Sequence, residues 1–114
     1  MNKYSADELF KIAYGHLQKK DFEKSTELFE KLLNDYPDNL SILRNLSHSY
    51  AFSGAFKKAE ESIKKIIKIK PDEPFAYQFL ASVLKNQDKI KEMIKIINEG
   101  LEKNLINKKW EFQK

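Results

Sequence analysis

The chain has 114 residues, of which 41% are hydrophobic and 33% charged, so it can bury a core as one folded domain and lacks the composition of a disordered segment. It has no cysteine, which excludes disulfide bonds, thiolate nucleophiles and sulfur-ligated metals. The net charge of +4 is weak support for nucleic-acid binding, because Arg44 is the sole arginine among 21 basic residues and phosphate and base recognition favours arginine.

Two helices are predicted first, over about residues 6–19 and 22–35. Ser5 and Glu8 have the spacing of a capping box, in which the two residues satisfy backbone N–H groups at the start of a helix. Pro37 follows the second helix and ends it, because proline has no N–H donor. Residues three or four positions apart form a packing stripe on the first helix: Leu9, Ile12, Ala13 and His16.

The next two helices are predicted over about residues 40–53 and 56–69, and Pro71 ends the second of them. Sliding the chain by 34 residues superposes this pair on the first pair without a gap. A small residue recurs at one place in each first helix, where it lets the second helix approach closely: Ala13, Ser47 and Ala81. Large residues recur in each second helix: Phe29, Ile63 and Ile97.

A third pair of helices is predicted over about residues 74–86 and 89–103, with weaker agreement to the repeat. Pro74 suits the first turn of a helix. Asp21 and Asp88 precede second helices, where an aspartate is a favourable cap.

The chain ends with a predicted turn and a short helix that carries Trp110 and Phe112. A solenoid needs its last repeat covered, so Trp110 is predicted to cover it. Met93 and Gly100 are seven residues apart and share one face of the last long helix. Gly100 either leaves room for Trp110 to dock or reflects the ordinary variation of a terminal repeat.

These recurring residues resemble the tetratricopeptide repeat. The second pair of helices has the fullest match, at the large, small and turn positions of that family: Leu43, Leu46, Ser47, Tyr50, Gly54, Phe56, Ala59, Ile63 and Pro71. The resemblance implies an all-α fold, an α-solenoid of three antiparallel helix hairpins in one domain, residues 1–114. The expected repeats cover about residues 6–39, 40–73 and 74–107, with a short C-terminal capping helix at 108–114.

The resemblance also implies a concave groove, lined by the first helices of successive hairpins, that binds a partner peptide or helix. The chain would then be a non-catalytic protein-binding module of the chaperone, adaptor, scaffold or assembly-factor type. The expected groove residues are Phe10, Tyr14, Leu17, Arg44, Asn45, His48, Phe52, Phe75, Gln78, Phe79, Ser82 and Lys85. Their aromatic members predict an exposed hydrophobic strip, or else contacts half-buried between adjacent hairpins.

Chaperone-binding members of the family hold the C-terminal carboxylates of heat-shock proteins with two lysines, two asparagines and an arginine. The matching positions in this chain are Phe10, Tyr14, Asn45, Phe75 and Phe79, and only Asn45 agrees. Aromatic rings cannot donate charged hydrogen bonds, so an apolar extended or helical peptide is the predicted ligand.

No catalytic residue, cofactor site or metal site is predicted. Neither His16 nor His48 has a second ligand at the spacing of a metal site, and the glycines are too scattered to form a phosphate-binding loop. His16 is predicted to be semi-buried on the packing stripe. His48 shares the other face of its helix with Arg44, where it is predicted to be the more exposed histidine and to contact a partner.

Two alternative functions remain open. The apolar strip or an open solenoid end would support self-assembly into a homo-oligomer. Lysines of the second repeat would support weak binding to nucleic acid or to an acidic surface: Lys57, Lys58, Lys64, Lys65, Lys68 and Lys70. The first residues lack the apolar core of a signal peptide and no run approaches a membrane span, so a cytoplasmic location is expected.

Overall fold

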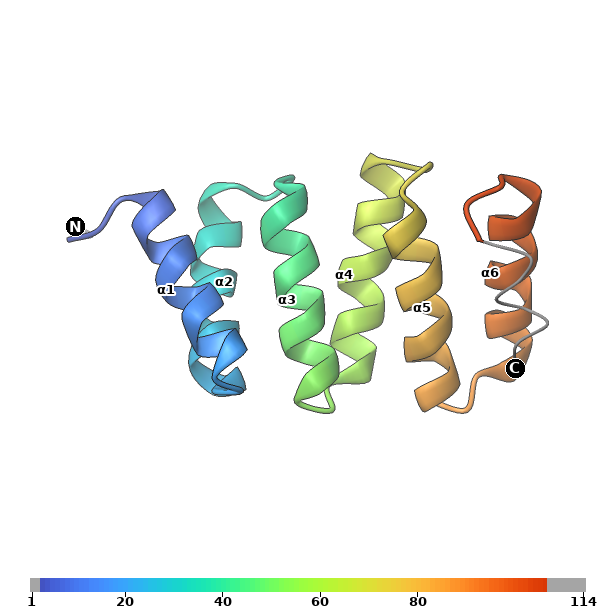
Figure 1. Cartoon of the computed structure of the whole chain (residues 1–114), viewed down its shortest axis with the longest axis horizontal. Helices are drawn as coiled ribbons and strands as arrows, with labels where there is room; N and C mark the ends of the chain where they lie inside the picture. The colour runs from blue at the N-terminus through green and yellow to red at the C-terminus, as the bar shows by residue number, and fades with distance from the viewer. Residues whose placement is uncertain (1–2, 107–114) are drawn as a thin grey trace.

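The computed structural model describes residues 3–106, which form three helix hairpins standing in a row (Figure 1). The six helices are α1 (Ala6–Gln18), α2 (Phe22–Asp35), α3 (Leu40–Phe52), α4 (Phe56–Ile69), α5 (Pro74–Asn86) and α6 (Ile90–Glu102). Each helix packs against the next one along the chain. The predicted all-α solenoid of hairpins is confirmed, and every predicted helix agrees with the structure to within one residue at each end.

Side-chain caps fix the starts of the first three helices. Ser5 and Glu8 form the predicted capping box, with both hydrogen bonds at 3.2 Å. Asp21 caps α2 as predicted, and Asn39 caps α3; their side-chain oxygens accept backbone N–H groups at 3.3 and 3.0 Å. Pro74 occupies the first turn of α5, also as predicted.

The prediction that Asp88 caps α6 is wrong. Lys89 is the N-cap residue of α6 and makes no side-chain capping hydrogen bond. Asp88 has a φ of 59°, in the left-handed region, and Lys20 and Gly54 have φ values of 65° and 88°. These three residues are 34 positions apart, so each hairpin turn needs one left-handed residue at the same place, and Asp88 serves the turn instead of the helix.

The residues that recur every 34 positions form the core. The small residues Ala13, Ser47 and Ala81 are at most 2% exposed, as their packing role predicts. The large residues of the second helices are also buried: Phe29, Ile63 and Ile97. The core therefore runs through all three hairpins.

Ile12 departs from the predicted packing stripe of α1. It is 37% exposed, whereas the equivalent residues of the next hairpins, Leu46 and Leu80, are at most 1% exposed. Leu46 and Leu80 lie on helices that follow a preceding hairpin, whereas no hairpin precedes α1 within residues 3–106. The sequence pattern marks the position as apolar, but a neighbouring hairpin is needed to bury it.

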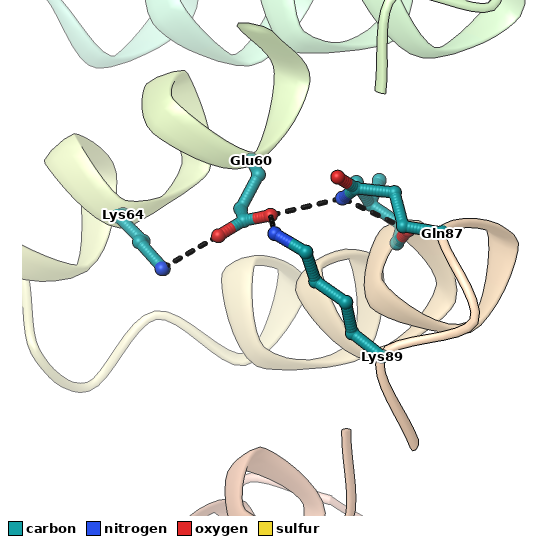
Figure 2. Close-up of polar contacts among 5 residues, drawn as sticks. Glu60, Lys64, Gln87 and Lys89 are labelled. Carbon is teal, nitrogen blue, oxygen red and sulfur yellow. Dashed lines mark hydrogen bonds and ion pairs between the residues drawn. The ribbon is translucent and has the colours of Figure 1, made fainter. Parts of the chain in front are cut away.

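Polar contacts also join the hairpins. Between the first and second hairpins, the hydroxyl of Ser49 lies 2.6 Å from the hydroxyls of both Ser25 and Thr26. Between the second and third hairpins, Glu60 is nearly buried, and the contacts that it makes are drawn in Figure 2. Its carboxylate accepts hydrogen bonds at 2.6–3.0 Å from three side chains: Lys64, Gln87 and Lys89.

The third hairpin ends in a turn that folds back on α6. Ile106 is buried against Tyr77, Ala81 and Ile97. A Cβ atom added to Gly100 would lie 2.5 Å from Cδ1 of Ile106. The space that Gly100 leaves is therefore filled by Ile106, while Trp110 and the predicted cap at 108–114 lie outside the described residues.

None of the six helices in residues 3–106 combines the length and the apolar composition that a bilayer-spanning helix requires.

Candidate partner-binding groove

Side chains from α3 and α5 gather around one histidine. The ring centroid of His48 lies 4.7 Å from that of Phe79, 5.3 Å from that of Phe75 and 5.4 Å from that of Phe52. Cζ of Arg44 lies 4.2 Å from the ring centroid of Phe75. We call these five residues the His48 cluster. They converge because residues four positions apart share one face of a helix, and α3 and α5 present these faces side by side.

The His48 cluster is open to solvent on one side. His48, Phe75 and Phe79 are half-buried, whereas Phe52 is 59% exposed. An open pocket of about 290 Å³ is lined by His48, Phe75, Gln78, Phe79 and Ser82. The rings of this pocket suit an apolar side chain of a ligand. Its amide and hydroxyl suit hydrogen bonds to the ligand backbone beside that side chain.

Both histidines are half-buried. Nδ1 of His48 is buried, and no atom of residues 3–106 forms a hydrogen bond with it. Burial, and secondarily the charge of Arg44, lower the pKa of His48 below its usual value of 6.5, which keeps the ring neutral at pH 7. Only Nε2 of this ring is therefore available to a partner.

The predicted residues on α1 divide between core and surface. Phe10 is half-buried and packs edge to face on Phe29, with ring centroids 5.5 Å apart. Leu17 is also half-buried against the core. Tyr14 is 43% exposed. The first hairpin thus contributes Tyr14 to the exposed surface, whereas the ring contact of Phe10 lies within the first hairpin, because Phe29 belongs to α2.

The remaining predicted residues are polar and flank the His48 cluster. Asn45 is half-buried and donates its amide to the carbonyl oxygen of Ser41 at 2.9 Å, within α3. Gln78, Ser82 and Lys85 are exposed on α5. Asn45, the single match to the chaperone-binding positions, is therefore engaged in its own helix.

Two pockets contain residues that the sequence did not single out. One of about 500 Å³ lies where the start of α1 meets the end of α2 and the start of α3, and it includes Leu32, Tyr36 and Ile42. The other, of about 120 Å³, is lined by Leu40, Ser41, Arg44, Ile66, Glu73 and Phe75. Both lie at helix ends, where the 34-residue period does not indicate which side chains meet.

Acidic neighbours neutralise much of the lysine charge in the second repeat. Lys64 pairs with Glu60 at 2.6 Å and Lys70 with Glu73 at 3.2 Å. Lys65 lies 3.9 Å from the nearest carboxylate oxygen of Asp38. These pairs reduce the field that would attract nucleic acid. Within residues 3–106, the His, Asp and Glu side chains form no group of three or more that could hold a metal ion.

Comparison with known proteins by sequence gives the tetratricopeptide repeat family. The sequence profile of the tetratricopeptide repeat matches residues 16–84. A stretch of 79 residues is 33% identical to the protein CTR9 homolog of Arabidopsis thaliana, and it covers 69% of this chain but only 7% of that protein.

Solved structures share the fold at low sequence identity. The Sgt2 TPR domain from Aspergillus fumigatus superposes with a TM-score of 0.77 at 22% identity, covering 87% of this chain and 66% of that one. A crystal structure of the MamA protein superposes with a TM-score of 0.81 at 21% identity, covering 87% of this chain and 54% of that one. Since the family profile spans more than half of the chain and the same period is visible in the helices, this chain belongs to the tetratricopeptide repeat family.

Proposed function

We propose that this domain binds a segment of a partner protein along α1, α3 and α5, with the His48 cluster as its main contact. Tetratricopeptide repeat domains are generally protein–protein interaction modules and are typically non-catalytic. The observation that carries the proposal is the accessible aromatic surface of the His48 cluster beside a pocket of about 290 Å³. Aromatic and arginine side chains contribute most of the binding free energy at protein interfaces.

The rigid position of the His48 cluster supports the proposal. The opposite faces of α3 and α5 are fixed in the core by Leu43, Leu46, Ala76 and Leu80, which are at most 1% exposed. The half-buried rings of His48, Phe75 and Phe79 therefore lose less conformational freedom when a partner binds than fully exposed rings would. A preorganised surface of this kind lowers the entropic cost of association.

The test is an affinity capture from native lysate with wild-type domain and two variants. Ser82→Arg places a long charged side chain on the rim of the pocket without removing core atoms, and Phe52→Ala removes the most exposed ring of the cluster. We expect both to lose the proteins that the wild type retains. Ile69→Ala, which changes an exposed apolar residue of α4, is the control.

Thermal unfolding should show that all three variants remain folded. If the folded Ser82→Arg and Phe52→Ala variants capture the same proteins as the wild type, the His48 cluster is not the binding surface.

Self-assembly is a second candidate, and the two ends of the solenoid favour it. Ile90 and Ile94 are 42% and 50% exposed on α6, and Ile12 is 37% exposed on α1. Residues equivalent to Ile12 are buried between hairpins, so two copies stacked head to tail would cover these side chains as the internal hairpins do. An Ile94→Lys variant should then lower the molar mass measured by light scattering at high concentration. A wild type that stays monomeric across concentrations would reject this candidate.

A further inference from the structure

We infer that the partner segment carries an acidic side chain next to the apolar side chain that fills the pocket at the His48 cluster, and that Arg44 binds this carboxylate. The inference rests on the proposed function, because it names the chemistry of the segment bound at the same surface.

Arg44 is held in place but retains its hydrogen-bonding capacity. Its guanidinium lies over the ring of Phe75, and the side chain is exposed. Within residues 3–106, no carboxylate lies within ion-pair distance of Arg44. Glu73 lines the same small pocket as Arg44, but it pairs with Lys70 at 3.2 Å. A guanidinium positioned by an aromatic face presents its N–H donors outward, where a carboxylate of a partner can accept them.

Apart from Glu73, which is paired with Lys70, the charged residues at the His48 cluster are cations. Among the predicted groove residues, Arg44 and Lys85 are the only charged ones, and neither is paired in the described part of the chain. Arg44 precedes His48 by one turn of α3, and Lys85 follows Ser82 by nearly one turn of α5. An apolar site with cations beside it complements an apolar side chain flanked by carboxylates, and it disfavours a basic segment.

The two pockets of this region place the two contacts close together. The pocket of about 290 Å³ and the pocket of about 120 Å³ share Phe75 as a common wall. Arg44 lines the smaller pocket and His48 lines the larger one. One segment can therefore place an apolar side chain in the larger pocket and a neighbouring carboxylate on Arg44.

The carboxylate is expected from a side chain and not from a chain terminus. A terminal carboxylate would need several cationic or amide donors around it. Asn45, the one amide at a matching position, already donates to Ser41, and the other matching positions are aromatic. Arg44 offers a single charged contact, which suits an aspartate or glutamate side chain.

The test begins with a randomised peptide library displayed on phage, with every peptide fused through its C-terminus so that no free terminal carboxylate is present. We expect selection on the wild-type domain to enrich peptides with an aspartate or glutamate beside a large apolar residue. Enrichment of basic or uncharged peptides would overturn the inference. A selection that enriches nothing would count against both the inference and the proposed function.

An enriched peptide is then synthesised with its acidic residue and with the matching amide, and binding is measured by fluorescence anisotropy. Arg44→Gln should weaken binding of the acidic peptide by about tenfold and change binding of the amide peptide by less than about twofold. Lys57→Gln removes one charge from the exposed face of α4 and should leave both affinities unchanged.

Phe52→Ala, which changes no charge, separates failure of the inference from failure of the proposed function. If Phe52→Ala weakens binding but Arg44→Gln leaves the acidic peptide bound as tightly as before, the inference is wrong and the proposed site stands. If neither variant changes binding, both are wrong.

Discussion

Glu60 is the one charged side chain among the buried residues of the described chain, and it is buried at a joint between hairpins. Burial by itself would raise its pKa, but hydrogen bonds from Lys64, Lys89 and Gln87 outweigh this and lower the pKa of Glu60 to about 2 (Figure 2). Its carboxylate therefore stabilises the fold at pH values above about 4.5, and this contribution is lost as the pH falls through about 2.

The prediction for Glu60→Gln is a loss of about 1–3 kcal/mol in the free energy of unfolding at pH 7, because a charged acceptor for two lysines is removed. Denaturant titrations should show the difference from wild type shrinking between pH 4.5 and pH 3. Glu27→Gln is the matched control, since Glu27 forms an exposed pair with Lys31 at 3.8 Å and should contribute less than about 0.5 kcal/mol. A difference that is the same at pH 3 and pH 7 would contradict the assignment.

His48 gives a second prediction at the scale of one residue. Because burial, with help from Arg44, lowers its pKa, the folded protein resists protonation of His48 while the unfolded chain accepts it near pH 6.5. Stability should therefore fall as the pH drops below 6.5. His48→Phe should remove this dependence and stabilise the fold by about 1 kcal/mol at pH 7, since the orphan Nδ1 is also removed.

His48→Gln is the matched control, because glutamine keeps a polar group but does not titrate. It should remove the pH dependence without the gain at pH 7. Equal slopes of unfolding free energy against pH for wild type and both variants would exclude this account of His48.

At the scale of the element, the hairpin turns share one backbone requirement. Lys20, Gly54 and Asp88 all have positive φ, which costs a residue with a side chain more than it costs glycine. Lys20→Gly is expected to stabilise the protein by about 0.5–1 kcal/mol in thermal unfolding. Lys11→Gly, at an exposed position in the interior of α1, should destabilise it by about 1 kcal/mol. Destabilisation by Lys20→Gly would show that its side chain contributes more than its backbone conformation costs.

The helices were predictable because the same types of residue recur every 34 positions. Small residues such as Ser47 and helix-ending prolines such as Pro71 recur together with the apolar stripes. The local signals that bound each helix therefore agree with the pattern of residues that pack in the core. Asp88 was assigned to the wrong role because an aspartate favours both a helix cap and a left-handed turn. Only the backbone conformation, φ 59°, distinguishes the two.

At the scale of the whole molecule, the sequence predicted the direction in which side chains point better than how far neighbours cover them. Phe10 and Tyr14 lie one turn apart on α1, yet Phe10 meets Phe29 and Tyr14 remains exposed. His48 was likewise placed on the correct face, but its contacts with the rings of Phe75 and Phe79 depend on how α5 packs beside α3. Such contacts join residues about 30 positions apart, and helical spacing within one element carries no information about them.

The end of the solenoid provides a prediction at this scale. Gly100→Ala would force Ile106 away from α6 and should cost about 1–3 kcal/mol in the free energy of unfolding. Gly15→Ala should instead stabilise the protein by about 0.5–1 kcal/mol, since nothing lies within 4 Å of an added Cβ there. The double variant Gly100→Ala/Ile106→Ala should lose the clash, so its cost should be less than the sum of the single costs. Strict additivity would show that the two residues do not compete for the same space.

The two joints between hairpins differ chemically, hydroxyl to hydroxyl at the first and carboxylate to amine and amide at the second. Thr26, Glu60 and Ile94 occupy one repeat position, and Ser49 and Val83 occupy another. If the second and third hairpins exchanged places in the chain, Thr26 would face Val83 and Ile94 would face Ser49. Both pairings would leave a hydroxyl against a hydrocarbon, so the order of these hairpins is encoded in their polar side chains.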